Sequence, residues 1–278
     1  MDARARAFVP PTAKLAVASE MVIVRGATFH FGAEAVWAGP TPGSSSFGPT
    51  PDGVVMTVAT FAIDRTEVTV RAYRACVQSG ACPAQPDGTT VDDCTYNRAD
   101  FDAHPINCVG FDDAKAFCAW SGKRLPTEAE FELAERGVNA RPFPWGEAPP
   151  TPKHLNACDE SCVREGAKRG STFSSLWAST GGDDGWPFTA PVGSYPDGAS
   201  PYGVLDLAGN VEEWTSDPWN SVGATAPLTT TPGYEDYVVR GGSWDLGTID
   251  MFCGTRRSAA ASTTRTSWLG FRCARDAS

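Results

Sequence analysis

The sequence predicts a mixed α+β fold that is irregular and low in secondary-structure content. The chain of 278 residues contains 28 glycines and 22 prolines, which interrupt helices and strands. Its nine tryptophans are heavy aromatic anchors that can hold long loops on a core. With 41% hydrophobic residues, the chain can bury a sizeable core. We therefore expect a globular protein in which regular elements are a minority.

The N-terminal third contains the first regular elements. An alternating apolar run at 21–32 predicts a strand, and residues 33–53 predict a loop. Residues 54–69 predict a strand that leads into a helix capped by Thr69. This helix ends near Gly80, since glycine is the usual residue just past a helix.

Two further helices follow. The first begins at Phe111, where two aspartates place negative charge in its first turn, and it ends at Gly122. In the second, Thr127 and Glu130 form a T-x-x-E capping box. Gly137 ends that helix.

The C-terminal half is predicted to be irregular. From residue 138 onward helical periodicity is almost absent, and we expect short strands such as those at 234–242 and 268–274. No repeat and no charged linker divides the chain. We therefore expect a flexible N-terminal tail at 1–20 and a single domain at 21–278.

The charge of the chain limits its partners. A formal net charge of -10 opposes binding to nucleic acid and to anionic membranes, and it favours cations such as calcium. No apolar run approaches the roughly 18 residues that span a membrane. The stretch LAVA at the start is too short for an export signal, so we expect either a tail or a boundary from which a signal was removed.

The nine cysteines predict an oxidising compartment, that is, a secreted, periplasmic or cell-surface protein. Zinc is a weaker interpretation because the sequence has no paired C-x2-C. Because nine is odd, at least one thiol is left over. The clustered cysteines, which resemble loop staples, are Cys76, Cys82, Cys94 and Cys108, and then Cys158 and Cys162.

Five segments in order along the chain carry a resemblance to a known family. They are MVIVRGATFHFG, FAIDRTEVTVRAY, GKRLPTEAEFELAERG followed by PFPWGE, APVGSYPDGASPYGVLDLAGNVEEWTSD, and VVRGGSW with LGFRCA. Together they resemble the formylglycine-generating enzyme family, also called the sulfatase-modifying-factor domain, over residues 21–275. The resemblance implies a variant of the C-type lectin fold that is often calcium-bound.

The resemblance also implies a copper chemistry. Enzymes of the family oxidise a cysteine of an unfolded sulfatase to formylglycine, using oxygen and a copper ion held by two cysteines. Cys253 corresponds to the second of these. The first falls on Thr248 when counted back from Cys253, or on Leu246 when counted forward from Ser243. Neither is a cysteine, so the soft thiolate pair that suits Cu(I) is missing.

No neighbouring residue replaces the missing ligand. Asp245 and Asp250 are hard oxygen ligands, and Met251 is a weak thioether. We therefore predict a domain without copper. The rival hypothesis is a formylglycine-generating oxidase in which Cys253 works with an unrecognised second ligand; the alternative role of Cys253 is a structural thiol.

Other catalytic interpretations are weaker. Ser243 could be a nucleophile, but it lacks the G-x-S-x-G elbow and a positioned histidine. The three histidines, His30, His104 and His154, are scattered and do not form the spacing of an iron site. Structural roles therefore account for these residues better.

Two clusters fit calcium, which takes about six to eight oxygen ligands. The alternative is that their acids cap turns and bind nothing. By resemblance, the first cluster comprises the side chains of Asn156 and Asp184 with the carbonyls of Ala157 and Trp186. The second comprises the carboxylates of Asp206 and Glu213 with the carbonyls of Gly209 and Val211.

The resemblance implies one disulfide, between Cys118 and Cys273. If Cys158 pairs with Cys162, and the four cysteines at 76–108 pair among themselves, Cys253 is the odd thiol. The connectivity itself stays open at the level of sequence.

The family scaffold implies a surface groove for an extended peptide. The residues expected to line or flank it, unless they serve only in packing, are Trp244, Arg256, Arg257, Arg265 and Trp268. We therefore predict a non-catalytic, calcium-stabilised module that binds a protein or peptide, with a glycan as the alternative ligand.

Overall fold

The computed structural model describes residues 20–32, 53–85, 93–170, 182–219, 236–246 and 257–277. The predicted N-terminal tail, nearly all of the predicted loop at 33–53, and the residues Cys253 and Arg256 lie outside these ranges. For Arg257 the described part is the backbone alone.

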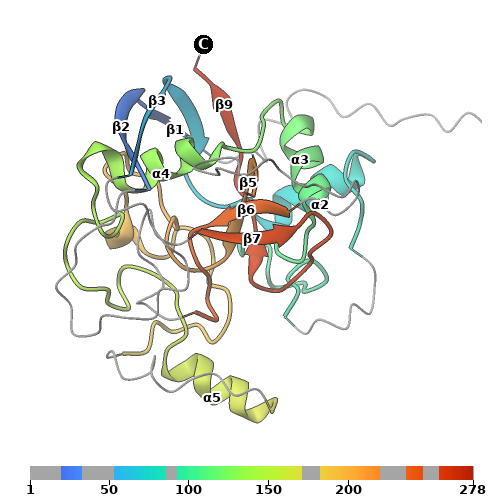
Figure 1. Cartoon of the computed structure of the whole chain (residues 1–278). Coiled ribbons are helices and arrows are strands. Elements are labelled where there is room, and N and C mark those ends of the chain that lie inside the picture. The colour runs from blue at the N-terminus through green and yellow to red at the C-terminus, as the bar shows by residue number, and fades with distance from the viewer. Residues whose placement is uncertain are drawn as a thin grey trace, which may run out of the picture.

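Short helices and strands alternate with long irregular segments, as the sequence predicts (Figure 1). The elements are β1 (Met21–Val24), β2 (Ala27–Phe31), β3 (Val54–Val58), β4 (Phe61–Asp64), α2 (Val70–Gln78), α3 (Phe111–Trp120), α4 (Glu128–Arg136), η1 (Gly137–Asn139), α5 (Glu160–Lys168), η3 (Pro196–Gly198), β5 (Glu212–Pro218), β6 (Asp236–Arg240), β7 (Arg257–Ala261), β8 (Leu269–Gly270) and β9 (Ala274–Asp276).

The described strands form three small sheets. The first has the order β1-β4-β9 and joins the beginning of the domain to its end. The second is the antiparallel pair β2-β3. The third has the order β7-β6-β5-β8, with β5 and β8 parallel. The C-terminal segment therefore provides an edge strand to two of the sheets, β9 to the first and β8 to the third.

The predicted strand at 21–32 is two strands, broken at Gly26. A Cβ atom at Gly26 would lie 2.6 Å from the backbone nitrogen of Thr60, so the two backbones approach each other too closely for a side chain. The break sends β1 and β2 into different sheets.

Local hydrogen bonds confirm the predicted helix starts. The Thr69 hydroxyl accepts from the backbone N–H of Ala72 at 3.2 Å. At α4, Thr127 accepts from the N–H of Glu130 at 3.1 Å, and the Glu130 carboxylate accepts from the N–H of Thr127 at 2.8 Å. Gly137 ends α4 with φ +66°, a positive value that favours glycine at this position.

Helix α5 corrects the prediction that helical structure is nearly absent beyond residue 138. Asp159 caps it, because its Oδ1 accepts from the N–H groups of Ser161 at 2.8 Å and Cys162 at 3.2 Å. The helix buries Ser161, Cys162 and Gly166, which do not form an apolar stripe. The pattern of large apolar residues therefore gave no signal for it.

The core has two main parts. One surrounds α2 and α3 and contains Trp214 and Phe271; the other lies between the N-terminal strands and α4. Trp214 is fully buried, and its indole N–H donates to the carbonyl of Val109 at 2.9 Å. Buried rings thus hold irregular segments, as expected from the composition.

Candidate functional site

The first predicted calcium cluster converges in space. One oxygen of the Asp184 carboxylate accepts from the backbone N–H of Ala157 at 3.0 Å, and the other accepts from the N–H of Trp186 at 2.9 Å. Asp184 therefore ties its own loop to the segment that contains Asn156. All four predicted ligand residues lie in this one small region.

The side chain of Asn156 has an oxygen without a hydrogen-bond partner among the described residues. The residue is 1% exposed, and its amide nitrogen donates to the carbonyl of Phe188 at 2.8 Å and to Oδ1 of Asn210 at 3.0 Å. Its own Oδ1 accepts no hydrogen bond from the part of the chain that the structure describes. A buried amide oxygen without a donor is costly, and a cation ligand is one way to satisfy it.

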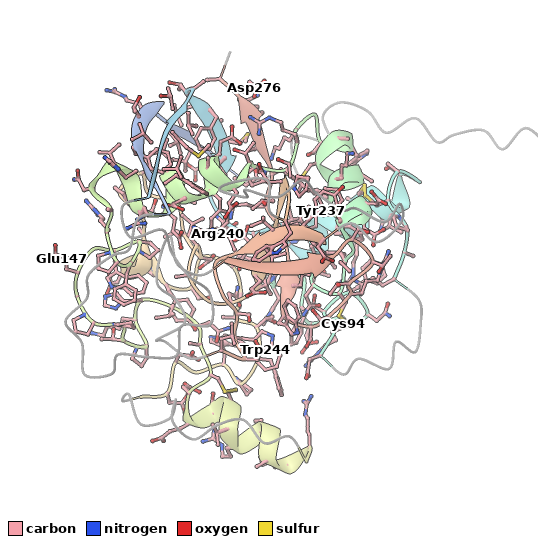
Figure 2. The ribbon with its side chains drawn as sticks, in the orientation of Figure 1. Cys94, Glu147, Tyr237, Arg240, Trp244 and Asp276 are labelled. Carbon is pink, nitrogen blue, oxygen red and sulfur yellow. A yellow bond between two sulfur atoms is a disulfide. The ribbon has the colours of Figure 1, made fainter. Side chains whose placement is uncertain are left out.

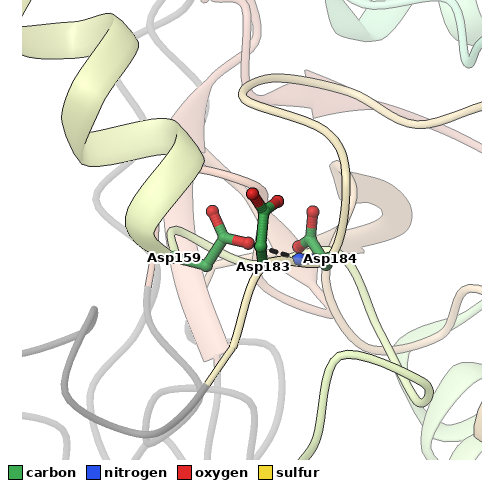
Figure 3. A group of neighbouring side chains, drawn as sticks. All are labelled: Asp159, Asp183 and Asp184. Carbon is green, nitrogen blue, oxygen red and sulfur yellow. Dashed lines mark hydrogen bonds between the residues drawn. The ribbon is translucent and has the colours of Figure 1, made fainter.

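Two more carboxylates crowd Asp184. Ligand oxygens of Asp159, Asp183 and Asp184 lie within 4.8 Å of one another (Figure 3). Asp159 also accepts from the backbone N–H of Asp184. Burial, with the charges of Asp159 and Asp183, raises the pKa of Asp184 to about 7, although two backbone N–H groups oppose the shift. These three carboxylates could therefore hold a metal ion.

Sequence reasoning missed Asp159 as a neighbour of this cluster. The available signal was its place between Cys158 and Cys162, because a cap residue inside a short disulfide loop is held in a fixed position.

The second predicted cluster is arranged differently. The carboxylate of Glu213 is paired with the guanidinium of Arg272, with Arg272 nitrogens 2.7 Å from each of its oxygens and both side chains fully buried. Arg272 also donates to the carbonyl of Asp206 at 3.0 Å. Because a cation already neutralises Glu213, this arrangement does not fit a calcium ion.

The segment between Asp206 and Glu213 packs on the first cluster. A Cβ atom at Gly209, which has φ +84°, would lie 2.2 Å from the carbonyl oxygen of Asn156. Only glycine allows this approach. Val211 is fully buried in the same segment.

Glu67 is a buried carboxylate that sequence reasoning did not single out. It is fully buried, and its Oε2 accepts from the side chain of Asn210 at 3.3 Å. Burial, together with the charges of Asp206 and Glu213, raises the pKa of Glu67 well above its ordinary value. Its position could be recognised only from the fold, because Asn210 lies 143 residues further along the chain.

Eight of the nine cysteines form disulfides among the described residues. No second cysteine therefore remains to join Cys253 in a copper site. The pairs are Cys76–Cys82, Cys94–Cys108, Cys118–Cys273 and Cys158–Cys162. A soft thiolate pair for Cu(I) is thus not available, and the donor set does not fit the copper ion of the family's enzymes.

Ser243 lies in a buried turn. It is 1% exposed, and its hydroxyl donates to the carboxylate of Asp245 at 2.6 Å. An aspartate orients the hydroxyl directly, and no described histidine contacts it. This is the geometry of a structural turn rather than of an activated nucleophile.

The predicted groove residues differ in exposure. Trp244 is 4% exposed, packs edge-on against Phe188 and donates its indole N–H to the carbonyl of Ser267, so it lies in the core and offers no stacking surface (Figure 2). Trp268 is half-buried against the core. The side chain of Arg265 is 46% exposed and forms an ion pair with Asp113.

Comparison with known proteins shows the family of the chain. A family described as "Sulfatase-modifying factor enzyme 1-like domain" matches residues 6–277. The chain belongs to this family. It is 35% identical over 207 residues to a formylglycine-generating enzyme from Bos taurus, which covers 70% of the chain and 48% of that protein. The chain thus spans about half the length of this relative.

Other relatives match over nearly their whole length. A formylglycine-generating enzyme from Thermomonospora curvata is 29% identical over 96% of the chain and 97% of that protein. The structure of PvdO from Pseudomonas aeruginosa has 28% sequence identity and a TM-score of 0.65, covering 93% of this chain and 95% of that one. The fold is therefore the family's C-type-lectin-like architecture.

The family also contains relatives without activity. An inactive C-alpha-formylglycine-generating enzyme 2 from Bos taurus is 34% identical over 62% of the chain and 50% of that protein. Membership of the family by itself therefore does not decide whether a chain is catalytic.

The described helices are all too short, or too polar, to cross a membrane. Four disulfides within the described residues are typical of proteins that fold in an oxidising compartment.

Proposed function

We propose that this chain is a non-catalytic, calcium-stabilised binding module that keeps the family scaffold without its copper chemistry. The cysteine inventory carries this proposal. Eight of the nine cysteines form four disulfides, so Cys253 is the one cysteine left as a candidate thiolate ligand for copper. One thiolate does not hold Cu(I) in the two-coordinate geometry that suits the ion.

Calcium is the proposed stabilising ion. Asn156 would bind it through its side-chain oxygen, Asp184 through its carboxylate, and Ala157 and Trp186 through their carbonyls. The ion would satisfy the unpartnered Oδ1 of Asn156 and offset the repulsion between the crowded carboxylates of Asp159, Asp183 and Asp184.

The proposed ligand is a protein segment in extended form. The C-terminal surface offers Arg265, whose side chain is 46% exposed, and the half-buried Trp268. The Arg265 guanidinium already pairs with Asp113, so a ligand carboxylate would have to share or replace that ion pair. Arginine suits carboxylates, because its guanidinium donates two parallel hydrogen bonds. We therefore expect an acidic or C-terminal peptide group at this surface. The disulfides support a secreted, periplasmic or cell-surface location.

The second candidate function is a formylglycine-generating oxidase that uses Cys253. Its support is the likeness to the enzymes of that name from Bos taurus and Thermomonospora curvata. This function requires a second copper ligand that is not a cysteine of this chain.

A Cu(I) titration of the disulfide-intact protein separates the two functions. We expect the wild type and Cys253→Ser to show the same weak response. Tight binding that Cys253→Ser abolishes would support the oxidase. A calcium titration of the same samples is the control, since both variants should bind calcium alike if the Asn156 cluster is the calcium site.

A further inference from the structure

A cavity of about 460 Å³ lies within the loop that follows η1, outside both predicted calcium clusters. Its lining includes Asn139, Arg141, Trp145 and Glu147. Figure 2 shows Glu147 at the left edge of the molecule, on the opposite side from Cys94. We propose that this cavity binds a small zwitterion, with its carboxylate on Arg141 and its ammonium group on Glu147.

The loop is held in one shape by its backbone. Ala140 adopts a left-handed conformation, φ +51°, directly after η1. Phe143 and Gly146 then exchange two backbone hydrogen bonds, of 3.2 and 3.0 Å. Phe143 is fully buried and anchors this turn in the protein. The cavity is therefore preformed, which lowers the entropic cost of binding.

Trp145 is fixed within the cavity wall. Its ring lies parallel to Phe143, with centroids 4.9 Å apart, and parallel to His154, with centroids 4.6 Å apart. Its indole N–H donates to the carbonyl of Ala148 at 2.9 Å. These stacked rings occupy the flat surface that a sugar ring would need, so the wall favours a ligand held by charge.

The two charged side chains that line the cavity, Arg141 and Glu147, have no polar partner among the described residues. Neither Arg141 nor Glu147 forms an ion pair or hydrogen bond within the described residues, and the two do not pair with each other. Arg124 shows the contrasting case, because it pairs with both Glu130 and Asp276. Arg141 can therefore accept a carboxylate in the two-bond geometry of a guanidinium, and Glu147 can accept an ammonium group.

The size and charge of the cavity define the ligand class. A volume of 460 Å³ lies within the range of small-molecule pockets. One positive and one negative group match a ligand that is neutral overall and carries both charges. A free amino acid and a short peptide share this chemistry. This inference does not depend on the calcium or copper assignments.

Isothermal titration calorimetry of the whole chain tests the inference. The probes are alanine and alanyl-alanine, with acetate and ethylammonium as ligands that carry a single charge. We expect Arg141→Gln and Glu147→Gln each to weaken binding of the zwitterion by about tenfold or more, since each removes one charge-assisted contact. Acetate and ethylammonium should bind more weakly than the zwitterion.

Lys115→Gln is the matched control, because Lys115 is an exposed cation on α3 that forms no ion pair with any described residue. It should bind like the wild type. Binding of alanine points to a free amino acid, and binding of alanyl-alanine alone points to a peptide. If neither probe binds the wild type, or if both glutamine variants bind as well as Lys115→Gln, the inference is overturned.

A second measurement does not depend on the variants. The NMR signal of the Trp145 indole N–H, assigned with Trp145→Phe, should shift on addition of the zwitterion because the ring lines the cavity. A signal that stays unchanged while heat is released would place the ligand elsewhere and contradict the proposal.

Discussion

Asn156 and Asn210 bind each other through both backbone and side chain. The backbone N–H of Asn210 donates to the carbonyl of Asn156 at 2.9 Å, and the side-chain amide of Asn156 donates to Oδ1 of Asn210 at 3.0 Å. The two segments in which the sequence predicts separate calcium sites are therefore one packed unit. Within the described residues, the Oδ1 of Asn156 in this unit lacks a hydrogen-bond partner, as does the Oε1 of Glu67 beside it.

Asp184→Asn should remove most of the stabilisation by calcium. In the wild type, calcium at about one hundred times its Kd raises the free energy of unfolding by about 2.7 kcal/mol, because the ion binds the folded state. Thermal unfolding with calcium and with a chelator measures this gain. Asp197→Asn, which changes an exposed aspartate of η3, should keep the full gain. Equal gains in Asp184→Asn and in the wild type would place the ion elsewhere.

Calcium affinity should rise with pH up to about pH 7. Only the ionised carboxylate of Asp184 binds the ion, and burial raises the pKa of this group to about 7. Below that pH, each calcium displaces a proton from Asp184, so affinity falls by up to about tenfold per pH unit. Calorimetry in buffers of different ionisation enthalpy counts the released protons. Affinity that stays constant from pH 5 to 7 argues against a role for Asp184.

Glu67→Gln should stabilise the protein at neutral pH. The pKa of Glu67 is raised in the folded state, so its protonated form is favoured there. Its contribution to stability is fully present below the ordinary pKa of 4.5 and is lost as pH rises through the folded-state value. The neutral glutamine keeps the shape and removes this loss. Chemical unfolding at pH 5 and at pH 8 measures the free energy of unfolding at each pH. The difference between the two values should be smaller for the variant than for the wild type.

His104 should make the protein less stable in acid. Burial lowers the pKa of His104 to about 4, below the ordinary 6.5, while its ring stacks on Phe101. The folded state therefore binds the proton less well than the unfolded state. Stability is lost as pH falls from 6.5 towards 4, with a slope of up to about 1.4 kcal/mol per pH unit. His104→Gln should flatten this slope, and an unchanged slope would assign it to other groups.

Arg272→Met should cost about 3–5 kcal/mol of folding stability, because it leaves the buried carboxylate of Glu213 without its cation. The double variant Arg272→Met with Glu213→Met should recover much of this loss, since no buried charge then remains in the pair. Denaturant unfolding measures both. If the double variant is as unstable as the sum of the single ones, the two residues are not coupled.

The sequence predicts best what short-range hydrogen bonds determine. The caps at Thr69 and Thr127 depend on groups three residues apart, and both predictions are confirmed. The first calcium cluster came from the family resemblance, and its residues do converge.

Long-range contacts explain what the sequence could not predict. Arg272 reaches Glu213 across 59 residues and Glu67 meets Asn210 across 143, and neither spacing has a local pattern. Trp244 illustrates the same difficulty, because a tryptophan after a Gly-Gly-Ser turn can lie in a groove or in the core. Its packing against Phe188, which is distant in sequence, places it in the core. The sequence did not predict helix α5, because a disulfide and an N-cap fix this helix and it has no apolar stripe.

We propose that this chain keeps the family scaffold but lacks the copper chemistry of the family's enzymes. The most direct measurement is mass spectrometry of a cysteine-containing, sulfatase-derived peptide after incubation with the disulfide-intact protein, Cu(I) and oxygen. We expect no conversion of cysteine to formylglycine. Conversion by the wild type that disappears in Cys253→Ser would contradict the account and establish the chain as an oxidase.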